Sequence, residues 1–369
     1  MSFPSLKIGD LVARTPIVQG GMGVGISLSG LASAVANEGG IGVIAGAMIG
    51  MSEPDIGRNP REANIRAMRK EIRKARELSN GILGVNIMVA LTNFTDLVKT
   101  SIEEKADVIF SGAGLPLDLP RYLKEYYEEK KEQAHTKLVP IVSSARAASI
   151  LCKKWLAKFD YLPDAFVVEG PKAGGHLGFQ PQELDDPGHS LETVVPQVVE
   201  VVREFEDRSG KRIPVIAAGG VYTGEDIKRF LDMGASGVQM GTRFVATHEC
   251  DADDRFKQAY VNAREEDVTI IQSPVGMPGR AIFGKFVEDA RAGLKKPFRC
   301  IFECIRTCKK EESPYCIAAA LLNAKKGNFD RGFAFSGSNV FRVDCIMSVQ
   351  ELIAGLLREY DAACSPNKA

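Results

Sequence analysis

Short apolar segments alternate with helical segments as far as about residue 244, and this alternation constrains the fold more than any other feature. The apolar segments are rich in Val and Ile without a polar–apolar alternation, which is typical of parallel strands covered on both faces. Eight strands are predicted, at residues 15–19, 41–45, 84–88, 107–110, 138–142, 165–168, 213–217 and 237–239.

The predicted helices follow these strands at the spacing of βα units. They cover residues 28–37, 59–78, 94–104, 120–132, 145–157, 192–209 and 224–233. An open, doubly wound sheet and a closed barrel both fit such an alternation. The count of eight favours a (β/α)8 TIM barrel, which we assign to residues 1–265.

The pattern changes after about residue 265. We expect Thr269 to Arg280 to be irregular, because Pro and Gly recur there, and the segment from Asn328 to Val343 is ambiguous. A helical segment that carries four of the eight cysteines lies between them. The prediction for residues 266–369 is therefore a mostly helical, Cys-rich appendage packed on the barrel.

The charges balance, with 47 Lys and Arg against 47 Asp and Glu. No global field would attract nucleic acid or an anionic membrane, so we expect a small-molecule substrate and neither of those partners. The first residues lack the pattern of a signal peptide, and no apolar stretch is long enough to span a membrane. Eight cysteines in a chain of this size are typical of a cytoplasmic protein. The oligomeric state is open, with a homodimer as the expectation.

Glycines gather at the expected carboxyl ends of the strands, where barrels of this type form their active sites. A glycine in such a place either makes a tight turn or lets the backbone approach a flat or anionic ligand. Several clusters at one end of the barrel favour the second explanation: Gly20, Gly21 and Gly23; Gly112 and Gly114; Gly174 and Gly175; Gly219 and Gly220; Gly241.

The turns after the last two strands lie where such barrels bind phosphate. Backbone N–H groups of Gly219, Gly220 and Gly241 would bind the anion, and Thr242 could add a hydroxyl. Asp226 is interpreted as a helix-end stabiliser. The chain has no P-loop and no dinucleotide-type glycine motif after the first strand, which favours a mononucleotide phosphate.

His176 is the leading catalytic candidate because it lies among glycines in the loop after the sixth strand. An imidazole there can act as a general base or as a hydrogen-bond donor to developing negative charge. The alternative is a surface histidine without a role. His135 and His248 have weaker contexts, and His189 is a distant second candidate.

Four cysteines, Cys300, Cys304, Cys308 and Cys316, form the densest group of potential metal ligands. A continuous helix would place the first three along one face. Their spacing fits neither the common zinc pairs nor the usual iron–sulfur runs. Buried structural thiols are the favoured interpretation, and no metal is predicted. The chain also lacks a His-Glu-x-x-His motif and a serine nucleophile elbow in the barrel region.

With these residues in view, the chain resembles the nitronate monooxygenase family, formerly called 2-nitropropane dioxygenases, and the related FMN-dependent enoyl-acyl-carrier-protein reductases. The matching segments span about residues 10 to 290. They are Pro16-Ile-Val-Gln-Gly-Gly-Met-Gly23, Gly84-Val-Asn-Ile-Met88, Glu169-Gly-Pro-Lys-Ala-Gly-Gly-His-Leu-Gly178, Pro214-Val-Ile-Ala-Ala-Gly-Gly220 and Gly237-Val-Gln-Met-Gly-Thr-Arg-Phe244.

The resemblance implies an FMN enzyme whose flavin lies across the barrel mouth. His176 would face the reactive side of the flavin, where it would assist deprotonation of the substrate or hold a nitronate. The residues implied in cofactor binding are Gly21, Met22, Gly23, Asn86, Gly174, Gly175, Gly219, Gly220, Gln239, Gly241 and Thr242.

The sequence also departs from the family pattern, through an extra segment near Leu117 to Lys137 and the Cys-rich tail after Pro297. The segment Ser273 to Ala281 is similar to relatives that oxidise reduced nicotinamide with quinones. The first hypothesis is therefore oxidation of alkyl nitronates with O2. The alternatives are NAD(P)H-dependent reduction of enoyl thioesters or quinones, and a flavin- or phosphate-binding barrel without turnover.

Overall fold

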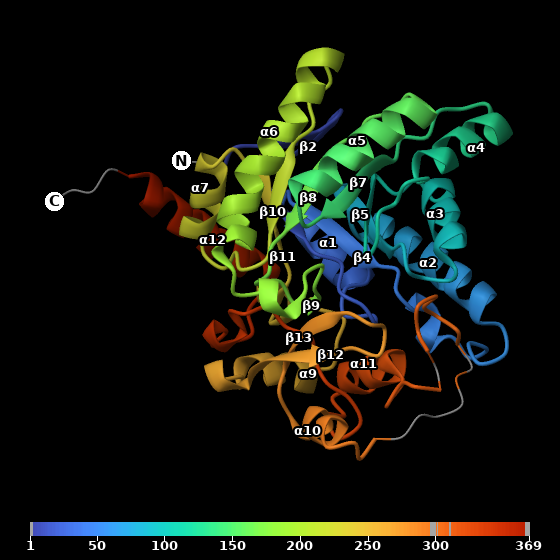
Figure 1. Cartoon of the computed structure of the whole chain (residues 1–369), viewed down its shortest axis with the longest axis vertical. Coiled ribbons are helices and arrows are strands. Elements are labelled where there is room, and N and C mark those ends of the chain that lie inside the picture. Colours follow the sequence, from blue (N-terminus) through green and yellow to red (C-terminus); the bar gives the residue numbers. More distant parts are fainter. Residues whose placement is uncertain (1–2, 296–299, 301, 310, 366–369) are drawn as a thin grey trace.

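A closed barrel of parallel strands forms the centre of the molecule (Figure 1). The computed structural model describes residues 3–295, 300, 302–309 and 311–365. Pairing of β11 with β3 closes the ring, so the closed barrel is confirmed over the open sheet. The strands around the ring are β3 (Ile17–Gln19), β4 (Ile41–Ala45), β5 (Ile82–Met88), β6 (Val108–Gly112), β7 (Lys137–Val142), β8 (Phe166–Glu169), β10 (Val215–Ala218) and β11 (Gly237–Met240).

Helices follow the first seven barrel strands, within a few residues of the predicted bounds. Each has an apolar stripe that packs on the outside of the barrel, and together with the strands these stripes form the largest core cluster. The helices are α1 (Ser29–Asn37), α2 (Pro60–Leu78), α3 (Phe94–Glu103), α4 (Pro120–Lys130), α5 (Ala145–Phe159), α6 (Leu191–Ser209) and α7 (Gly224–Asp232).

The barrel interior is a separate core of inward-facing side chains, among them Phe110 and Val167. Leu6 and Ile8 belong to the same core and come from an N-terminal hairpin, β1 (Leu6–Ile8) and β2 (Leu11–Ala13). Because Leu6 reaches Gly237 at the start of β11, the hairpin covers the amino-terminal end of the barrel. The opposite end is left for the active site.

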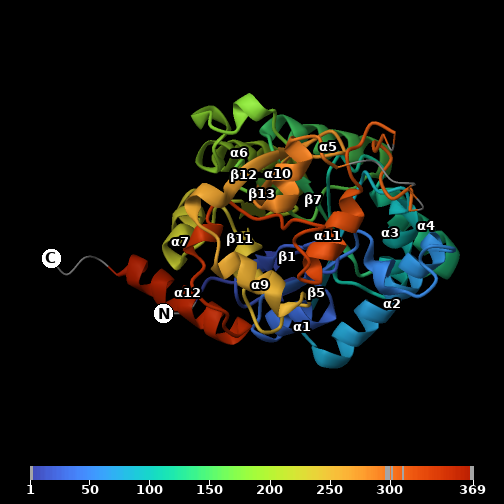
Figure 2. The ribbon, with the colours of Figure 1, turned by 90° about the horizontal axis from the view of Figure 1, so that it is seen from below.

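The eighth helix of the ring comes from the C-terminus. Only the short α8 (Thr242–Val245) follows β11 directly. Helix α12 (Val349–Cys364) instead packs between α7 and α1, as Figure 2 shows. The last part of the chain therefore completes the outer layer of the barrel.

The expectation of an irregular segment at Thr269 to Arg280 was wrong. These residues form an antiparallel hairpin, β12 (Val268–Gln272) and β13 (Pro278–Ile282). The Pro and Gly residues that suggested irregularity fall in its turn and in β13, where β13 also pairs with β9 (Gly175–His176). The second partner strand, which could not be foreseen from local pattern, explains why β13 is stable.

The remaining C-terminal elements cover the carboxyl end of the barrel (Figure 1). They are α9 (Asp254–Val261), α10 (Lys285–Arg291) and α11 (Ile317–Lys325). Between α10 and α11 the described residues form no helix, so the helical arrangement of the cysteines is not seen there; Pro297 lies outside the described residues. The division at residue 265 stays a prediction. Within the described part of the chain, no helix is long and apolar enough to cross a membrane.

Candidate active site

A large cavity lies at the carboxyl ends of the barrel strands and has a volume of about 520 Å³. This size is typical of sites for cofactors and small ligands. We call it the main cavity. Every predicted site residue lines it: Gly21, Met22, Gly23, Asn86, Gly174, Gly175, His176, Gly219, Gly220, Gln239, Gly241 and Thr242.

The first glycine turn approaches β5 so closely that a side chain would not fit. A Cβ atom on Gly21 would lie 2.3 Å from the Cβ atom of Asn86. The side-chain amides of Asn86 and Gln239 border the main cavity, and neither has a hydrogen-bond partner among the described residues. Their donors and acceptors are therefore available to a polar ligand.

The turns after β10 and β11 form a second polar end of the main cavity. Gly219 and Gly220 have φ values of +95° and +87°, which an L side chain rarely adopts. Lys172 lies against Gly220, and its ammonium group would favour an anion. The Oγ1 atom of Thr242 accepts a hydrogen bond of 3.0 Å from the Gly337 amide, which leaves the Thr242 hydroxyl proton available.

Sequence reasoning missed the contribution of residues 336–339 to this end. Asn339 donates to the Gly220 carbonyl at 2.8 Å, and the Ser338 amide donates to the Lys172 carbonyl at 3.1 Å. Ser336 lines the main cavity. Its Oγ atom is buried and has no partner among the described residues, and such an orphaned hydroxyl usually has a ligand or a water as its partner. The small polar run Ser336-Gly-Ser-Asn339 was the only signal in the sequence.

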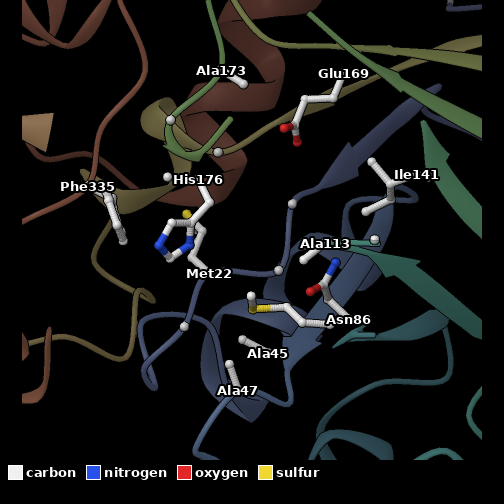
Figure 3. A pocket seen from close by; sticks show the side chains of 18 of the residues that line it. Met22, Ala45, Ala47, Asn86, Ala113, Ile141, Glu169, Ala173, His176 and Phe335 are labelled. Carbon is white, nitrogen blue, oxygen red and sulfur yellow. The ribbon is translucent and has the colours of Figure 1, made fainter. Parts of the chain in front are cut away.

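His176 borders the main cavity on the side where Figure 3 shows Phe335 and Met22. Its Nε2 atom lies 2.8 Å from the Oγ atom of Ser273. The rings of His176 and Phe335 meet edge to face, with centroids 5.0 Å apart. Burial lowers the pKa of His176 to about 4, so the imidazole is neutral at pH 7. Nδ1, which has no partner in the described part of the chain, is available to a ligand.

A buried arginine fixes the loop that carries His176. Arg280 of β13 donates to the carbonyl oxygens of Pro171 and Ala173, the latter at 2.9 Å. In the β9–β13 ladder, Gly279 pairs with His176. The hairpin therefore holds the His176 loop through backbone pairing and through charge-assisted hydrogen bonds.

Glu169 ends β8, and its carboxyl group projects into the main cavity (Figure 3). The described residues offer its carboxyl group no hydrogen bond. Although the cavity exposes part of the side chain, protein surrounds it, and this burial raises the pKa of Glu169 to about 7. Sequence reasoning did not single out this residue.

Apolar side chains form the outer part of the main cavity. Leu115 comes from the loop after β6, whereas Ile317, Ala318 and Leu321 come from α11, beyond the barrel. A substrate that enters from this side would pass between the barrel loops and the C-terminal region.

Asp226 and the other three histidines do not line the main cavity. Asp226 forms a capping box with Thr223 at the start of α7, so its assignment as a helix-end stabiliser is confirmed. His135 is exposed, as expected. His189 contacts the carboxylate of Asp186 at 2.8 Å, and His248 is not among the cavity residues.

A second cavity of about 250 Å³ adjoins the first, and we call it the cysteine cavity. Cys300, Cys304, Cys308 and Cys316 all line it, and Cys304 lines the main cavity as well. Burial raises the pKa of Cys304 to about 12, and the neighbouring thiols of the other three contribute to this shift. All four are free thiols.

A barrel with a glycine-walled cavity and a buried neutral histidine at the carboxyl ends of its strands is typical of an enzyme that acts on small molecules. Comparison with known proteins gives the family. The nitronate monooxygenase family model matches residues 5–359. The chain therefore belongs to the nitronate monooxygenase family, whose members are flavin-dependent oxidoreductases.

The individual relatives have diverse names. A Mycobacterium tuberculosis "(3aS,4S,5R,7aS)-5-hydroxy-7a-methyl-1-oxo-octahydro-1H-indene-4-carboxyl-CoA dehydrogenase" is 30% identical over 76% of this chain and 66% of its own length, just under two thirds. A probable nitronate monooxygenase of Staphylococcus aureus is 28% identical over 74% of this chain and 77% of its own.

Solved structures confirm the fold. FabK from Thermotoga maritima has a TM-score of 0.71 and 29% identity over 94% of this chain and 93% of its own. A nitroalkane oxidase from Streptomyces ansochromogenes, at 20% identity, has a TM-score of 0.70 and covers 95% and 96%.

Proposed function

We propose that this protein is an FMN-dependent oxidoreductase that oxidises alkyl nitronates with O2. The observation that carries the proposal is the main cavity itself, in which glycine turns, unpartnered amides and a neutral imidazole surround one space. Bound FMN would accept electrons from the substrate and pass them to O2.

The fit to a flavin mononucleotide rests on both ends of the cavity. The backbone at Gly21 to Gly23 offers a flat surface to a ring system, and the Asn86 and Gln239 amides can bind its polar edge. Gly220, Gly241, Thr242 and Ser336 would hold the phosphate. Residues 336–339 pack against this end, which favours a mononucleotide over a longer dinucleotide.

His176 would act on the substrate through Nδ1. Ser273 can donate to Nε2 or accept from it, because a hydroxyl has both capacities. With Nδ1 unprotonated, the ring accepts a proton from a carbon acid. With Nδ1 protonated, it donates a hydrogen bond to the anionic nitro oxygens of a nitronate. A neutral imidazole can supply either tautomer without the cost of a buried charge.

A second candidate function is hydride transfer to an enoyl thioester or a quinone with NAD(P)H as the donor. The apolar outer part of the main cavity favours it, since Leu115, Ile317 and Leu321 would suit an acyl chain or a hydrophobic ring. The M. tuberculosis relative is named as a dehydrogenase of a CoA thioester. In this case His176 would donate to the carbonyl oxygen of the substrate.

Anaerobic stopped-flow measurement separates these functions. The holoprotein is mixed with ethylnitronate, NADH or NADPH, and flavin bleaching is followed. We expect bleaching by ethylnitronate and reoxidation by O2. Bleaching by a nicotinamide alone, followed by reoxidation with crotonyl-CoA or a quinone, would establish the second function. A purified protein that binds FAD but no FMN would contradict the cofactor assignment.

A further inference from the structure

The cysteine cavity has a composition found at no other place in the molecule that the structure describes. Four of its lining residues are cysteines, contributed by one short stretch of chain. The remaining lining residues are Thr92, Glu303, Ile305, Arg306, Ser313, Tyr315 and Ile317. Four cysteines around one cavity are the composition of a thiolate metal site rather than that of an ordinary apolar core.

Backbone hydrogen bonds fix the position of Cys304 against the barrel. Ile305 forms an antiparallel bridge with Leu91, and the Thr92 amide donates to the Cys304 carbonyl at 3.1 Å. The Arg306 amide donates to the carbonyl of Ala90 at 3.0 Å. Cys304 is therefore held between the cysteine cavity and the main cavity.

Amide groups already point at two of the sulfur atoms. The Glu303 amide donates to Cys300 Sγ at 3.4 Å. Cys316 is the N-cap of α11, and its Sγ accepts from the Ala319 amide at 3.5 Å. Hydrogen bonds of this kind and the positive end of a helix both stabilise a thiolate or a metal-bound sulfur. Arg306 also lines the cavity and would offset negative charge.

The arrangement fits a polynuclear centre better than a single ion. In the described ranges, no group of three or more His, Cys, Asp or Glu side chains is arranged to hold a metal ion. A mononuclear zinc site brings its ligands to one point. Here the four cysteines are spread around about 250 Å³, and in an iron–sulfur cluster of the four-iron type each thiolate binds a different iron.

The irregular course of the chain supports the same conclusion. Between the end of α10 at Arg291 and the start of α11 at Ile317, the described residues form no regular element except the single bridge at Ile305. So few regular elements among the described residues of a long connection are uncommon in a compact domain unless the connection has a function. A bound centre would cross-link it, as metals do in other small irregular folds.

We propose that Cys300, Cys304, Cys308 and Cys316 ligate an iron–sulfur cluster in the cysteine cavity, beside the main cavity. The spacing C-x3-C-x3-C-x7-C differs from the common runs, which is why the sequence alone favoured structural thiols. The structure adds evidence for a cluster that the spacing alone does not give, because all four cysteines line one cavity. Cys304 borders both cavities, so the cluster would lie next to the substrate side of the site.

The test is the metal content of the full chain, purified anaerobically and reconstituted with ferrous iron and sulfide. We expect about four iron and four acid-labile sulfide per chain, and an electron paramagnetic resonance signal after reduction with dithionite. Cys304→Ser and Cys308→Ser should each lose most of the iron and the signal. Cys345→Ser, at an exposed cysteine away from the cavity, should keep both.

The flavin content of each variant reports whether the barrel has folded, so loss of iron with retained flavin is a local effect. Wild-type protein that retains no more iron and sulfide than the Cys304→Ser variant would overturn the proposal. Stoichiometric zinc in place of iron, or an unchanged iron content in both cavity variants, would overturn it as well.

Discussion

The Nε2 atom of His176 lies 2.8 Å from the Oγ atom of Ser273, although the two residues are 97 positions apart in the chain. The Val275 amide contacts the same Oγ atom at 3.4 Å. This serine lies just after β12, in the hairpin that also pairs with β9. The orientation of the imidazole therefore depends on a segment beyond the barrel strands.

Ser273→Ala should lower turnover without loss of flavin. Removal of one hydrogen bond of about 1 kcal/mol would reduce kcat by roughly fivefold and shift its pH profile, since the hydroxyl no longer orients the ring. Steady-state kinetics measure kcat and its pH profile, and flavin absorbance measures the flavin content. Ser209→Ala is the control, because the Ser209 hydroxyl bonds to the Phe205 carbonyl at the end of its own helix, α6. Equal losses in both variants would contradict a positioning role.

His176→Ala should retain FMN and lose turnover by about 100-fold or more, the usual contribution of a general acid or base. Flavin content and kcat with the established substrate are the two measurements. His189→Ala serves as the control, because His189 pairs with Asp186 away from the main cavity. Unchanged turnover in His176→Ala would remove this residue from the mechanism.

The stability of the apoprotein should depend on pH through His176. Its pKa is about 4 in the folded chain and 6.5 in the unfolded chain. Between these values the unfolded chain binds a proton that the folded chain does not, so the free energy of unfolding falls as the pH is lowered from 6.5 to 4. Urea denaturation at pH 7.5 and pH 5 tests this. The loss should be smaller in His176→Asn; an identical loss would refute the assignment.

Glu169 should have the opposite effect. Its pKa is raised from 4.5 to about 7, so the folded chain keeps a proton that the unfolded chain releases, and stability declines as the pH rises from 4.5 to 7. Glu169→Gln should therefore stabilise the apoprotein more at pH 8 than at pH 5. Glu53→Gln, at an exposed ion pair with Arg66, is the control. A gain that is equal at both pH values would argue against a buried, protonated carboxyl group.

Ser336→Ala should weaken FMN binding without destabilising the apoprotein. The buried hydroxyl has no partner among the described residues, so its removal costs the apoprotein little. Loss of a hydrogen bond to a phosphate would raise the Kd of FMN by about tenfold. Ser338→Ala is a matched control, since Ser338 Oγ is equally buried and unpartnered but does not border the main cavity. Fluorescence titration of each variant's apoprotein with FMN gives the two Kd values to be compared.

The barrel could be predicted from the sequence because each strand carries its own signal. Parallel strands buried on both faces are continuous apolar runs, and the glycines mark their carboxyl ends; β4 was predicted with its observed bounds. The gathering of residues from Gly21 to Thr242 around one cavity follows from the same geometry, since all barrel strands end on one face.

The parts that could not be predicted depend on long-range pairing. The residues of β13 contain Pro278 and Gly279 and give no local strand signal, yet pairing with β12 and β9 stabilises them. Ser336 reaches the main cavity, and the Ser273 hydroxyl reaches His176, only because the C-terminal region folds back over the barrel. Likewise, the four clustered cysteines were expected along a helix, whereas the described residues around them form no helix before α11 and line the cysteine cavity.

Helix α12 closes the outer ring, and residues 336–339 complete the end of the main cavity that we propose binds the phosphate. During synthesis on the ribosome, the barrel strands emerge long before these residues. A nascent chain that stops at the last barrel strand would have its sheet but lack an outer helix and one wall of the cofactor site. Capture of the flavin should thus occur late, once residues 336–339 have folded against the barrel.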